Sequence, residues 1–308
     1  MGGVIGDIAI AAPPVIMMAL GLFVMFRVMG ELDLSVDATY TNGAAITALS
    51  VLSGGSPWLG LLAATLFGAL IGSIVFVIHR LGRTAFLLAS LIVLTGLYSI
   101  NLRVLGGATV GLIGEPSIFA FFGERPGDLA RAGLLCLVVL GVLSALYAFL
   151  HTAFGLSMRA AGNNAVMARA NGTDTRATLL VGAMMAGALY GLGGGLQVQI
   201  QGYADITMGI GAVVICVAAL FLGELFFPPE GRIAAGLAAV VLGGALYVTI
   251  LTLALRSGLP PTDLRLATAS ILAFAVMISS GQVRGRLRAG IAAVLATRSR
   301  DRAGNAAK

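Results

Sequence analysis

Residues 58–78 read WLGLLAATLFGALIGSIVFVI, an apolar run without a charged side chain. About 20 helical residues cross the ~30 Å hydrocarbon core of a bilayer, so this run is long enough for a transmembrane helix. Comparable runs recur along a chain of 308 residues that is 58% hydrophobic and 10% charged, with a mean hydropathy of +1.00. Soluble domains have about 25% charged residues, and a transmembrane barrel would alternate apolar with polar residues. The sequence therefore predicts an all-α, polytopic transmembrane helical bundle.

Nine apolar runs predict about nine spans. They cover residues 9–29, 38–53, 58–78, 85–103, 132–151, 178–200, 209–225, 233–255 and 266–282. Cytoplasmic loops retain Lys and Arg. With the N-terminus outside and the C-terminus in the cytoplasm, most Lys and Arg residues lie on the cytoplasmic side, so we expect this orientation. We expect a transmembrane domain over residues 1–283 and a basic cytoplasmic tail over residues 284–308.

Two pairs of short stretches indicate a weak inverted repeat. DLSVD at 33–37 precedes the second run, and DITMG at 205–209 leads into the seventh. ASLI at 89–92 in the fourth run is echoed by ASIL at 269–272 in the ninth. The predicted topology sends the second and seventh spans in opposite directions, as in transporters built from inverted halves. Chance similarity between two apolar stretches is the alternative.

Several polar residues are candidates for a translocation path, because polar groups inside a bilayer are costly and mostly face a cavity or the bundle interior. The candidates are Asp33, Thr39, Asn42, Thr47, Tyr98, Asn101, Gln197, Gln201 and Asp205. Those on the second run lie along one side of a helix, where hydroxyl groups also serve close helix packing. Those ending the fourth and sixth runs are equally typical of a membrane interface. Asp33 could instead pair with Arg27 and Glu31 at the inner end of the first run.

No arrangement of residues supports catalysis or metal binding. The chain has no HExxH, GxSxG or Walker A motif, and Cys136 and Cys216 lie in separate apolar runs. The GLGGG stretch at 191–195 lacks the Lys and Ser or Thr of a phosphate loop. Small residues recur every four positions at Ala183, Gly187, Gly191 and Gly195, and this period predicts close helix packing. We assign no catalytic residue, metal ligand or cofactor to this chain. The basic residues of the inner loops and the tail explain the net charge of +6, so the charge does not indicate binding to nucleic acid.

Four stretches carry a family resemblance: GELDLSVDATYTNGAAITA at 30–48, GLYSINLRVLGG at 96–107, GLSMRAAGNNAVMARANG at 155–172 and GYADITMGIGAVVICVAALFLGE at 202–224. Together they resemble the permeases of the branched-chain amino acid and ribose class of ABC importers. LYSINLR combined with YADITMGIG is similar to a subgroup assigned to tryptophan or tyrosine import. The likeness covers roughly residues 15 to 285.

The resemblance implies a type II importer permease of the bacterial inner membrane. Such a permease pairs, usually as two copies, with two cytosolic ATPase subunits that bind ATP and Mg, and it receives cargo from an extracytoplasmic solute-binding protein. We expect the cargo to be a small polar solute. The subgroup narrows this expectation to an amino acid, and within the amino acids to an aromatic one. A stand-alone secondary carrier or channel is the alternative, and it is weakened because the acidic residues cluster near span ends.

In that family the loop matching residues 157–172 forms a short coupling helix that fits a groove on the ATPase. The residues carried over are Ser157, Arg159, Ala160, Gly162, Asn163, Asn164, Ala168, Arg169 and Gly172. Arg and Asn side chains supply charged and hydrogen-bonding contacts, while the alanines allow a compact helix to dock closely. A solvated loop is the alternative. Asp37 stands where the wider class often has Gly, so the backbone freedom of Gly is absent there.

Overall fold

The structure, a computed structural model, describes residues 2–122, 127–227, 232–258, 260 and 263–279. The predicted basic tail over residues 284–308 lies outside the described residues. The helices are α1 Gly2–Phe23, α2 Val36–Leu52, α3 Pro57–Gly82, α4 Phe86–Leu105, α5 Asp128–Leu150, α6 Ala153–Asn163, α7 Ala165–Ala170, α8 Thr175–Gln201, α9 Ala212–Phe226, α10 Ile233–Arg256 and α11 Leu264–Ser279. The remaining elements are the π-helical turn η1 Val24–Met29, the 3-10 turn η2 Ile118–Phe122, and the strands β1 Thr109–Gly111 and β2 Tyr203–Asp205.

Each of the nine predicted runs coincides with a helix, which confirms the all-α membrane class. Within the described residues, six helical segments are long and apolar enough to cross a bilayer: α1 with η1, α3, α4, α5, α8 and α10. In contrast, α2 has 17 residues and α9 has 15. At 1.5 Å per residue these two helices are only about 22–26 Å long. Nine complete spans are therefore not confirmed.

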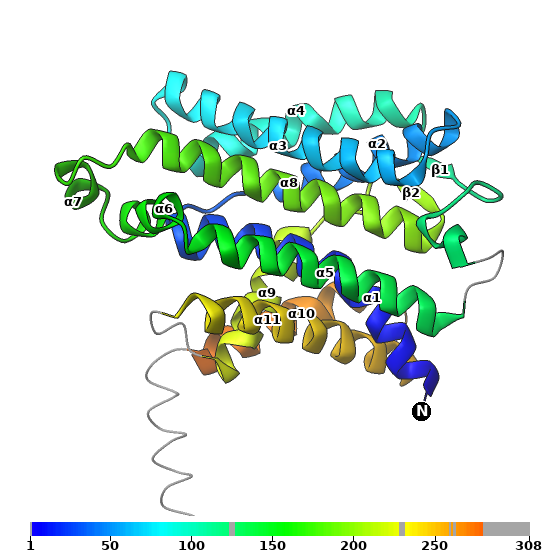
Figure 1. The fold of residues 1–308 in the computed structure, drawn as a ribbon. Helices are drawn as coiled ribbons and strands as arrows, with labels where there is room; N and C mark the ends of the chain where they lie inside the picture. Colours follow the sequence, from blue (N-terminus) through cyan, green and yellow to red (C-terminus); the bar gives the residue numbers. More distant parts are fainter. Residues whose placement is uncertain (1, 123–126, 228–231, 259, 261–262, 280–308) are drawn as a thin grey trace, which may run out of the picture.

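The long helices lie side by side and define two ends of the molecule (Figure 1). At one end, here called the α6–α7 end, α6 and α7 connect α5 to α8. At the other, β1 pairs antiparallel with β2, so that Thr109 lies opposite Asp205. We call this the hairpin end for its two antiparallel strands, although α5 to α8 separate them in the chain. The N-terminus lies at the hairpin end, so α1, α3 and α5 run toward the α6–α7 end, while α4, α8 and α10 run back (Figure 1).

The short helices α2 and α9 begin inside the bundle and run in opposite directions. Near the hairpin end, the Thr47 hydroxyl of α2 lies 3.4 Å from the Gly60 carbonyl oxygen at the start of α3. Near the α6–α7 end, Glu224 of α9 pairs with Arg27 of η1. α2 packs against α3 and α4, and α9 packs against α10 and α11 in the same chain order. This arrangement confirms the inverted repeat predicted from DLSVD and DITMG.

The predicted small-residue ridge of α8 is confirmed, and it lies against α2 and α3. A Cβ atom added at Gly187 would be 2.1 Å from the Gly68 carbonyl oxygen, and one added at Gly43 would be 2.1 Å from the Gly191 carbonyl oxygen. Backbones at these crossings touch directly, because no side chain separates them. In a bilayer, where lipid tails are as apolar as leucine, such close packing is a main source of helix association.

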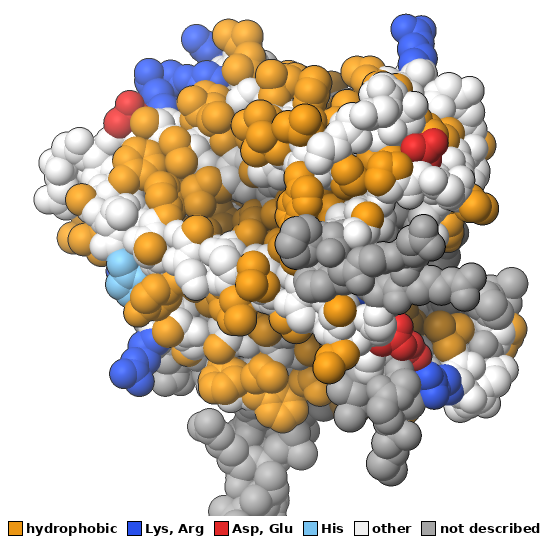
Figure 2. Space-filling view, turned by 45° about the vertical axis from the view of Figure 1, so that its right-hand side comes forward, with side chains coloured by type: hydrophobic (Ala, Val, Ile, Leu, Met, Phe, Trp, Pro, Cys, Tyr) orange, Lys and Arg blue, Asp and Glu red, His pale blue; other side chains and the backbone are white. Residues whose placement is uncertain are grey.

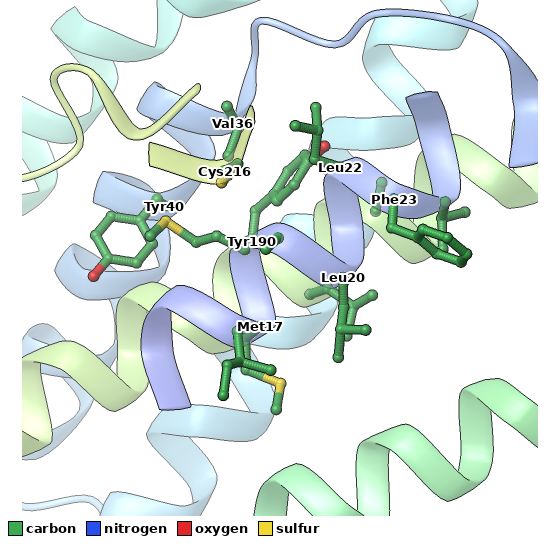
Figure 3. Close-up of a cluster of buried hydrophobic side chains, with 14 of the residues drawn as sticks. Met17, Leu20, Leu22, Phe23, Val36, Tyr40, Tyr190 and Cys216 are labelled. Atoms are coloured by element: carbon green, nitrogen blue, oxygen red, sulfur yellow. The ribbon is translucent and has the colours of Figure 1, made fainter. Parts of the chain in front are cut away.

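The buried core joins both repeats. Side chains from α1, α2, α8 and α9 converge there, among them the fully buried Met17, Leu20, Tyr190 and Cys216 (Figure 3). The outer surface is also apolar, with exposed leucines and other large hydrophobic residues along α3, α4 and α5. Figure 2 shows hydrophobic side chains over most of one face, with the charged groups nearer its margins. An apolar exterior around a packed core is what a lipid-embedded bundle requires.

Candidate functional site

Both short helices are preceded by the same local turn. The Asp33 carboxylate accepts a hydrogen bond from the Ser35 amide at 2.8 Å, and the Asp205 carboxylate accepts one from the Thr207 amide at 2.7 Å. Asp and Asn side chains commonly fix a turn by bonding to the backbone two residues on. The DLS and DIT motifs therefore encode equivalent turns at corresponding places in the two repeats.

Asp37 joins the two repeats. Its carboxylate oxygens accept hydrogen bonds from the Gly211 amide at 3.0 Å and the Val213 amide at 2.8 Å. These amides belong to the first turn of α9, whose unpaired N–H groups and helix dipole favour a negative charge. Gly211 has φ of +89°, a left-handed conformation that glycine adopts freely, at the N-cap of α9. Asp37 thus caps α9 from the first turn of α2.

Beside Asp37 is a cavity of about 420 Å³ between α2, α4 and the segment leading into α9. Its lining residues are Asp37, Ala38, Thr41, Leu94, Thr95, Tyr98, Asn101, Ile206 and Ile210. Asp37 is the one carboxylate among them, and Tyr98 supplies an aromatic ring that is half exposed. The cavity can therefore offer a small solute a negative charge, hydroxyl groups and an apolar wall.

Of the predicted path residues, Tyr98 and Asn101 line this cavity, and Asn42 contacts Asn101. Asn42 Nδ2 donates to Asn101 Oδ1 at 2.8 Å, and Asn101 Nδ2 donates to the Ala38 carbonyl at 2.9 Å. This buried pair ties α2 to α4 at the cavity wall. Asp37 and Thr41 also line the cavity but were not among the predicted residues. Since Asp37 bonds to residues 174 and 176 positions away, only its departure from the class pattern could have drawn attention to it.

The remaining path candidates lie elsewhere. Thr39 and Thr47 are buried, and Thr47 faces α3 and α8, with its hydroxyl 2.7 Å from a Cβ added at Gly195. Asp33 is also buried, and the ion pair predicted between it and Arg27 is wrong, because Arg27 Nε instead donates to Glu224 Oε1 at 2.6 Å. That pair joins η1, the turn that follows α1, to α9.

Gln197, Gln201 and Asp205 lie toward the hairpin end of α8 and in β2. Gln197 is partly buried and Gln201 is exposed. Hydrogen bonds from the hydroxyl groups of Thr109 and Thr207 hold the pKa of the Asp205 carboxyl below its ordinary value. The intervening Gln199 is buried and accepts a hydrogen bond from the Ile118 amide at 3.1 Å, so it anchors η2. These residues build the hairpin end of the molecule and not the wall of the cavity.

The predicted coupling segment forms two helices instead of one. α6 is capped by Thr152, whose hydroxyl accepts from the Gly155 amide at 3.1 Å. Asn164 ends α6 and caps α7, because its side-chain oxygen accepts from the Val166 and Met167 amides at 3.1 and 3.0 Å. Asparagine is a strong N-cap, so the second Asn of the GNN sequence explains the break between the helices.

One side of this segment is anchored and the other is free. A Cβ atom added at Gly162 would lie 1.9 Å from the Val28 carbonyl, and Met158 is fully buried, so α6 is seated against η1. Ala168 is also buried, while Ser157, Arg159 and Gly162 are partly exposed. The other predicted coupling residues are exposed: Ala160, Asn163, Asn164, Arg169 and Gly172. Val166 and Met167 are 71% and 64% exposed, and this apolar tip was not predicted.

A second cavity of about 550 Å³ lies behind α7. Glu31, His79, Arg80, Arg169 and Arg176 are among the side chains that line it, from four different parts of the chain. Burial raises the pKa of the Glu31 carboxyl above its ordinary value, and the charge of His79 partly opposes that shift. The cavity thus lies between α7, the end of α3 and the segment that leads into α2.

A family model described as branched-chain amino acid transport system, permease component, matches residues 4–280. The chain belongs to this permease family. A tyrosine transport system permease protein of Clostridioides difficile is 32% identical over 257 residues, which cover 83% of this chain and 84% of that protein. The ribose import permease protein RbsC of Escherichia coli is 28% identical, covering 73% of this chain and 71% of that protein. No solved structure matches the chain.

The resemblance inferred from the four sequence stretches is thereby confirmed. The permease is the membrane component of an ABC-type transport system for small solutes, and the class implies an ATPase and a binding protein as partners. The six long apolar helical segments found among the described residues make it a multi-pass membrane protein. In this permease, the cavity beside Asp37 lies between α2, α4 and the segment that leads into α9, and α6–α7 forms the exposed tip at one end.

Proposed function

We propose that this permease imports a small polar solute across the bacterial inner membrane, as a subunit driven by separate ATPases and supplied by an extracytoplasmic binding protein. The observation that carries the proposal is the α6–α7 segment, which is capped at both helix starts and seated on η1 yet presents an exposed apolar and basic tip. Rigid capping of both helices together with an exposed apolar tip is typical of a segment that binds a partner protein, and not of a solvated loop. The α6–α7 end is then cytoplasmic, and the N-terminus faces out.

In this proposal the ATPase contacts the exposed tip. Val166 and Met167 supply apolar area, while Asn163 and Arg169 supply directed hydrogen bonds. ATP and Mg are held by the ATPase, whose closure moves α6. Because Gly162 of α6 touches the backbone of Val28, that movement passes to η1 and, through the Arg27–Glu224 pair, to α9. The force thus reaches both repeats.

The cavity beside Asp37 is the proposed section of the translocation path. An amino acid would place its ammonium group near the Asp37 carboxylate and its side chain against Tyr98 and Leu94. An aromatic ring suits this wall because aromatic pairs add about 0.5–1.5 kcal/mol beyond the area that they bury. The similarity to a protein named for tyrosine transport supports this choice of cargo. A second permease copy completes the path, and the binding protein meets the hairpin end.

One observation favours a second function, that of a stand-alone ion-coupled carrier. Such carriers use carboxylates within the membrane, and Asp33 and Asp37 both lie near the start of α2 inside the bundle. However, Asp37 is already engaged by two amides of α9, which gives it a structural role without a coupling ion.

The test is cargo-stimulated ATP hydrolysis by the complete transporter in vesicles. Replacing Asn163 and Arg169 together with alanine removes two polar contacts of the tip, and we expect stimulation to fall about tenfold, from the loss of roughly 1–2 kcal/mol of interface energy. Arg83→Ala, an exposed arginine at the end of α3, is the matched control and should retain full stimulation. Unchanged stimulation in the double variant would refute the docking role.

A further inference from the structure

A basic cleft lies between α1, α5, α6 and α10 at the α6–α7 end. It consists of two cavities, of about 430 and 650 Å³, and Arg159, Arg232 and Ile233 line both. We call this feature the arginine cleft. It is separate from the cavity beside Asp37, and its lining includes no residue of α7.

Within the part of the chain that the structure describes, the arginine cleft carries positive charge without an acidic partner. Among the described residues no carboxylate lines either cavity, and neither Arg159 nor Arg232 makes an ion pair. Arg27, a third arginine at the wall of the larger cavity, is already paired with Glu224. Two guanidinium groups directed at one cleft favour an anion, and phosphate is the group that arginine binds best through two parallel hydrogen bonds.

The inner part of the cleft is apolar and reaches into the membrane-spanning helices. The larger cavity extends to Phe23 and Gly236, on α1 and α10. A Cβ atom added at Gly236 would lie 2.9 Å from the Phe23 ring, so the glycine allows α10 to pass close to that ring. At the rim, Tyr147 lines the smaller cavity and its ring lies 4.2 Å from that of His151. Tyrosine at the end of a span is typical of the lipid headgroup level.

We propose that the arginine cleft binds an anionic phospholipid, with its phosphate between Arg159 and Arg232 and an acyl chain against Phe23 and Gly236. A ligand with an anionic head and an apolar body matches both parts of the cleft, whereas an acidic protein surface would match only the arginines. Basic pockets between transmembrane helices are a known form of lipid recognition. The lipid would fasten α6 to the start of α10, and thus hold the segment that contacts the ATPase.

The test uses the full-length permease alone, purified in a neutral detergent. Native mass spectrometry would measure retention of added phosphatidylglycerol, with phosphatidylcholine and inorganic phosphate as the comparison arms. We expect phosphatidylglycerol to be retained in preference to phosphatidylcholine and inorganic phosphate to be lost. Arg232→Gln should weaken retention of phosphatidylglycerol about fivefold, as expected for one basic residue near a lipid headgroup. Arg232→Lys should recover part of it, because the charge remains without the bidentate geometry.

Arg176→Gln is the matched control, since Arg176 is exposed at the same end but lies outside the cleft. Equal losses in Arg176→Gln and Arg232→Gln would overturn the proposal, because they would indicate general surface charge. Retention of inorganic phosphate as strong as that of the lipid would also overturn it, by showing an anion site without a role for the acyl chain. Unchanged lipid retention in Arg232→Gln, together with weaker assembly with the ATPase, would assign the cleft to a protein partner instead.

Discussion

The turns that open the short helices, DLSVD before α2 and DITMG before α9, share one geometry but perform different tasks. Asp33 is 1% exposed and fixes its turn inside the protein, whereas Asp205 accepts a hydrogen bond from Thr109 across the β1–β2 strand pair at one end of the molecule. The fifth residue differs as well. Asp37 reaches across to cap α9, and Gly209 leaves room for the Asp37 backbone.

The difference shows how an inverted repeat becomes a functional pair. Two identical turns would place either two carboxylates or two glycines at the centre. Two carboxylates would repel each other, and two glycines would leave the first turn of α9 without its cap in a medium where an unsatisfied backbone group costs several kcal/mol. One Asp and one Gly give a close contact with satisfied amides.

The largest expected effect follows from filling the space at Gly209. A Cβ atom there would lie 1.9 Å from the Asp37 carbonyl oxygen. Because the obstacle is backbone, Gly209→Ala should force the repeats apart and lower the free energy of unfolding by about 3 kcal/mol. Thermal unfolding in detergent would measure this, with Gly96→Ala as the control, since nothing lies within 4 Å of a Cβ at that helical position. Equal melting temperatures for the two variants would contradict the proposed contact.

A smaller effect is expected from Asp37 itself. Asp37→Ala removes both acceptors of the α9 cap and should cost about 1–2 kcal/mol, while Asp37→Asn keeps one acceptor and should cost about half as much. Cargo uptake should fall in both variants, because both remove the negative charge from the cavity. If Asp37→Asn transports an amino acid as well as the original chain does, the carboxylate has no part in cargo passage.

An effect of similar size is expected from the contrast between the two turn aspartates. Asp33→Ala leaves the Ser35 amide without its acceptor inside the protein, and we expect a loss of about 2 kcal/mol. Asp205→Ala exposes the Thr207 amide near solvent and should cost about 0.5 kcal/mol. Chemical unfolding of both variants in one detergent gives the comparison. Equal losses would show that the buried and open turns contribute alike.

The smallest effect concerns pH. The folded-state pKa of Asp205 is lowered by the Thr109 and Thr207 hydroxyl groups. Its contribution is therefore present above the unfolded-state pKa and is lost as the pH falls through the folded-state pKa. Thr109→Val should reduce stability by a few tenths of a kcal/mol at neutral pH, given solvent screening. The difference in the free energy of unfolding between Thr109→Val and the original chain should shrink as the pH is lowered. A difference that grows on acidification would contradict the stabilising role of the ionised Asp205 carboxylate.

Much of the fold was predictable because apolar runs, the repeated DLS and DIT motifs and the four-residue period of α8 are local signals. The role of Asp37 and the Arg27–Glu224 pair were not, because their partners lie 174 to 197 positions away in the chain. The break in the coupling segment had a visible signal in Asn164, an N-cap residue in the middle of a helical stretch. The exposure of Val166 and Met167 depends on how α7 sits on α6, which periodicity does not specify.

The central claim is that this permease moves solute only when an ATPase acts on α6–α7. The direct measurement is uptake of L-tyrosine by vesicles that contain either the permease alone or the permease with its ATPase and binding protein. We predict no accumulation by the permease alone under an ion gradient, and ATP-dependent accumulation by the complete assembly. Accumulation by the permease alone, driven by the gradient, would contradict the account and identify a secondary carrier.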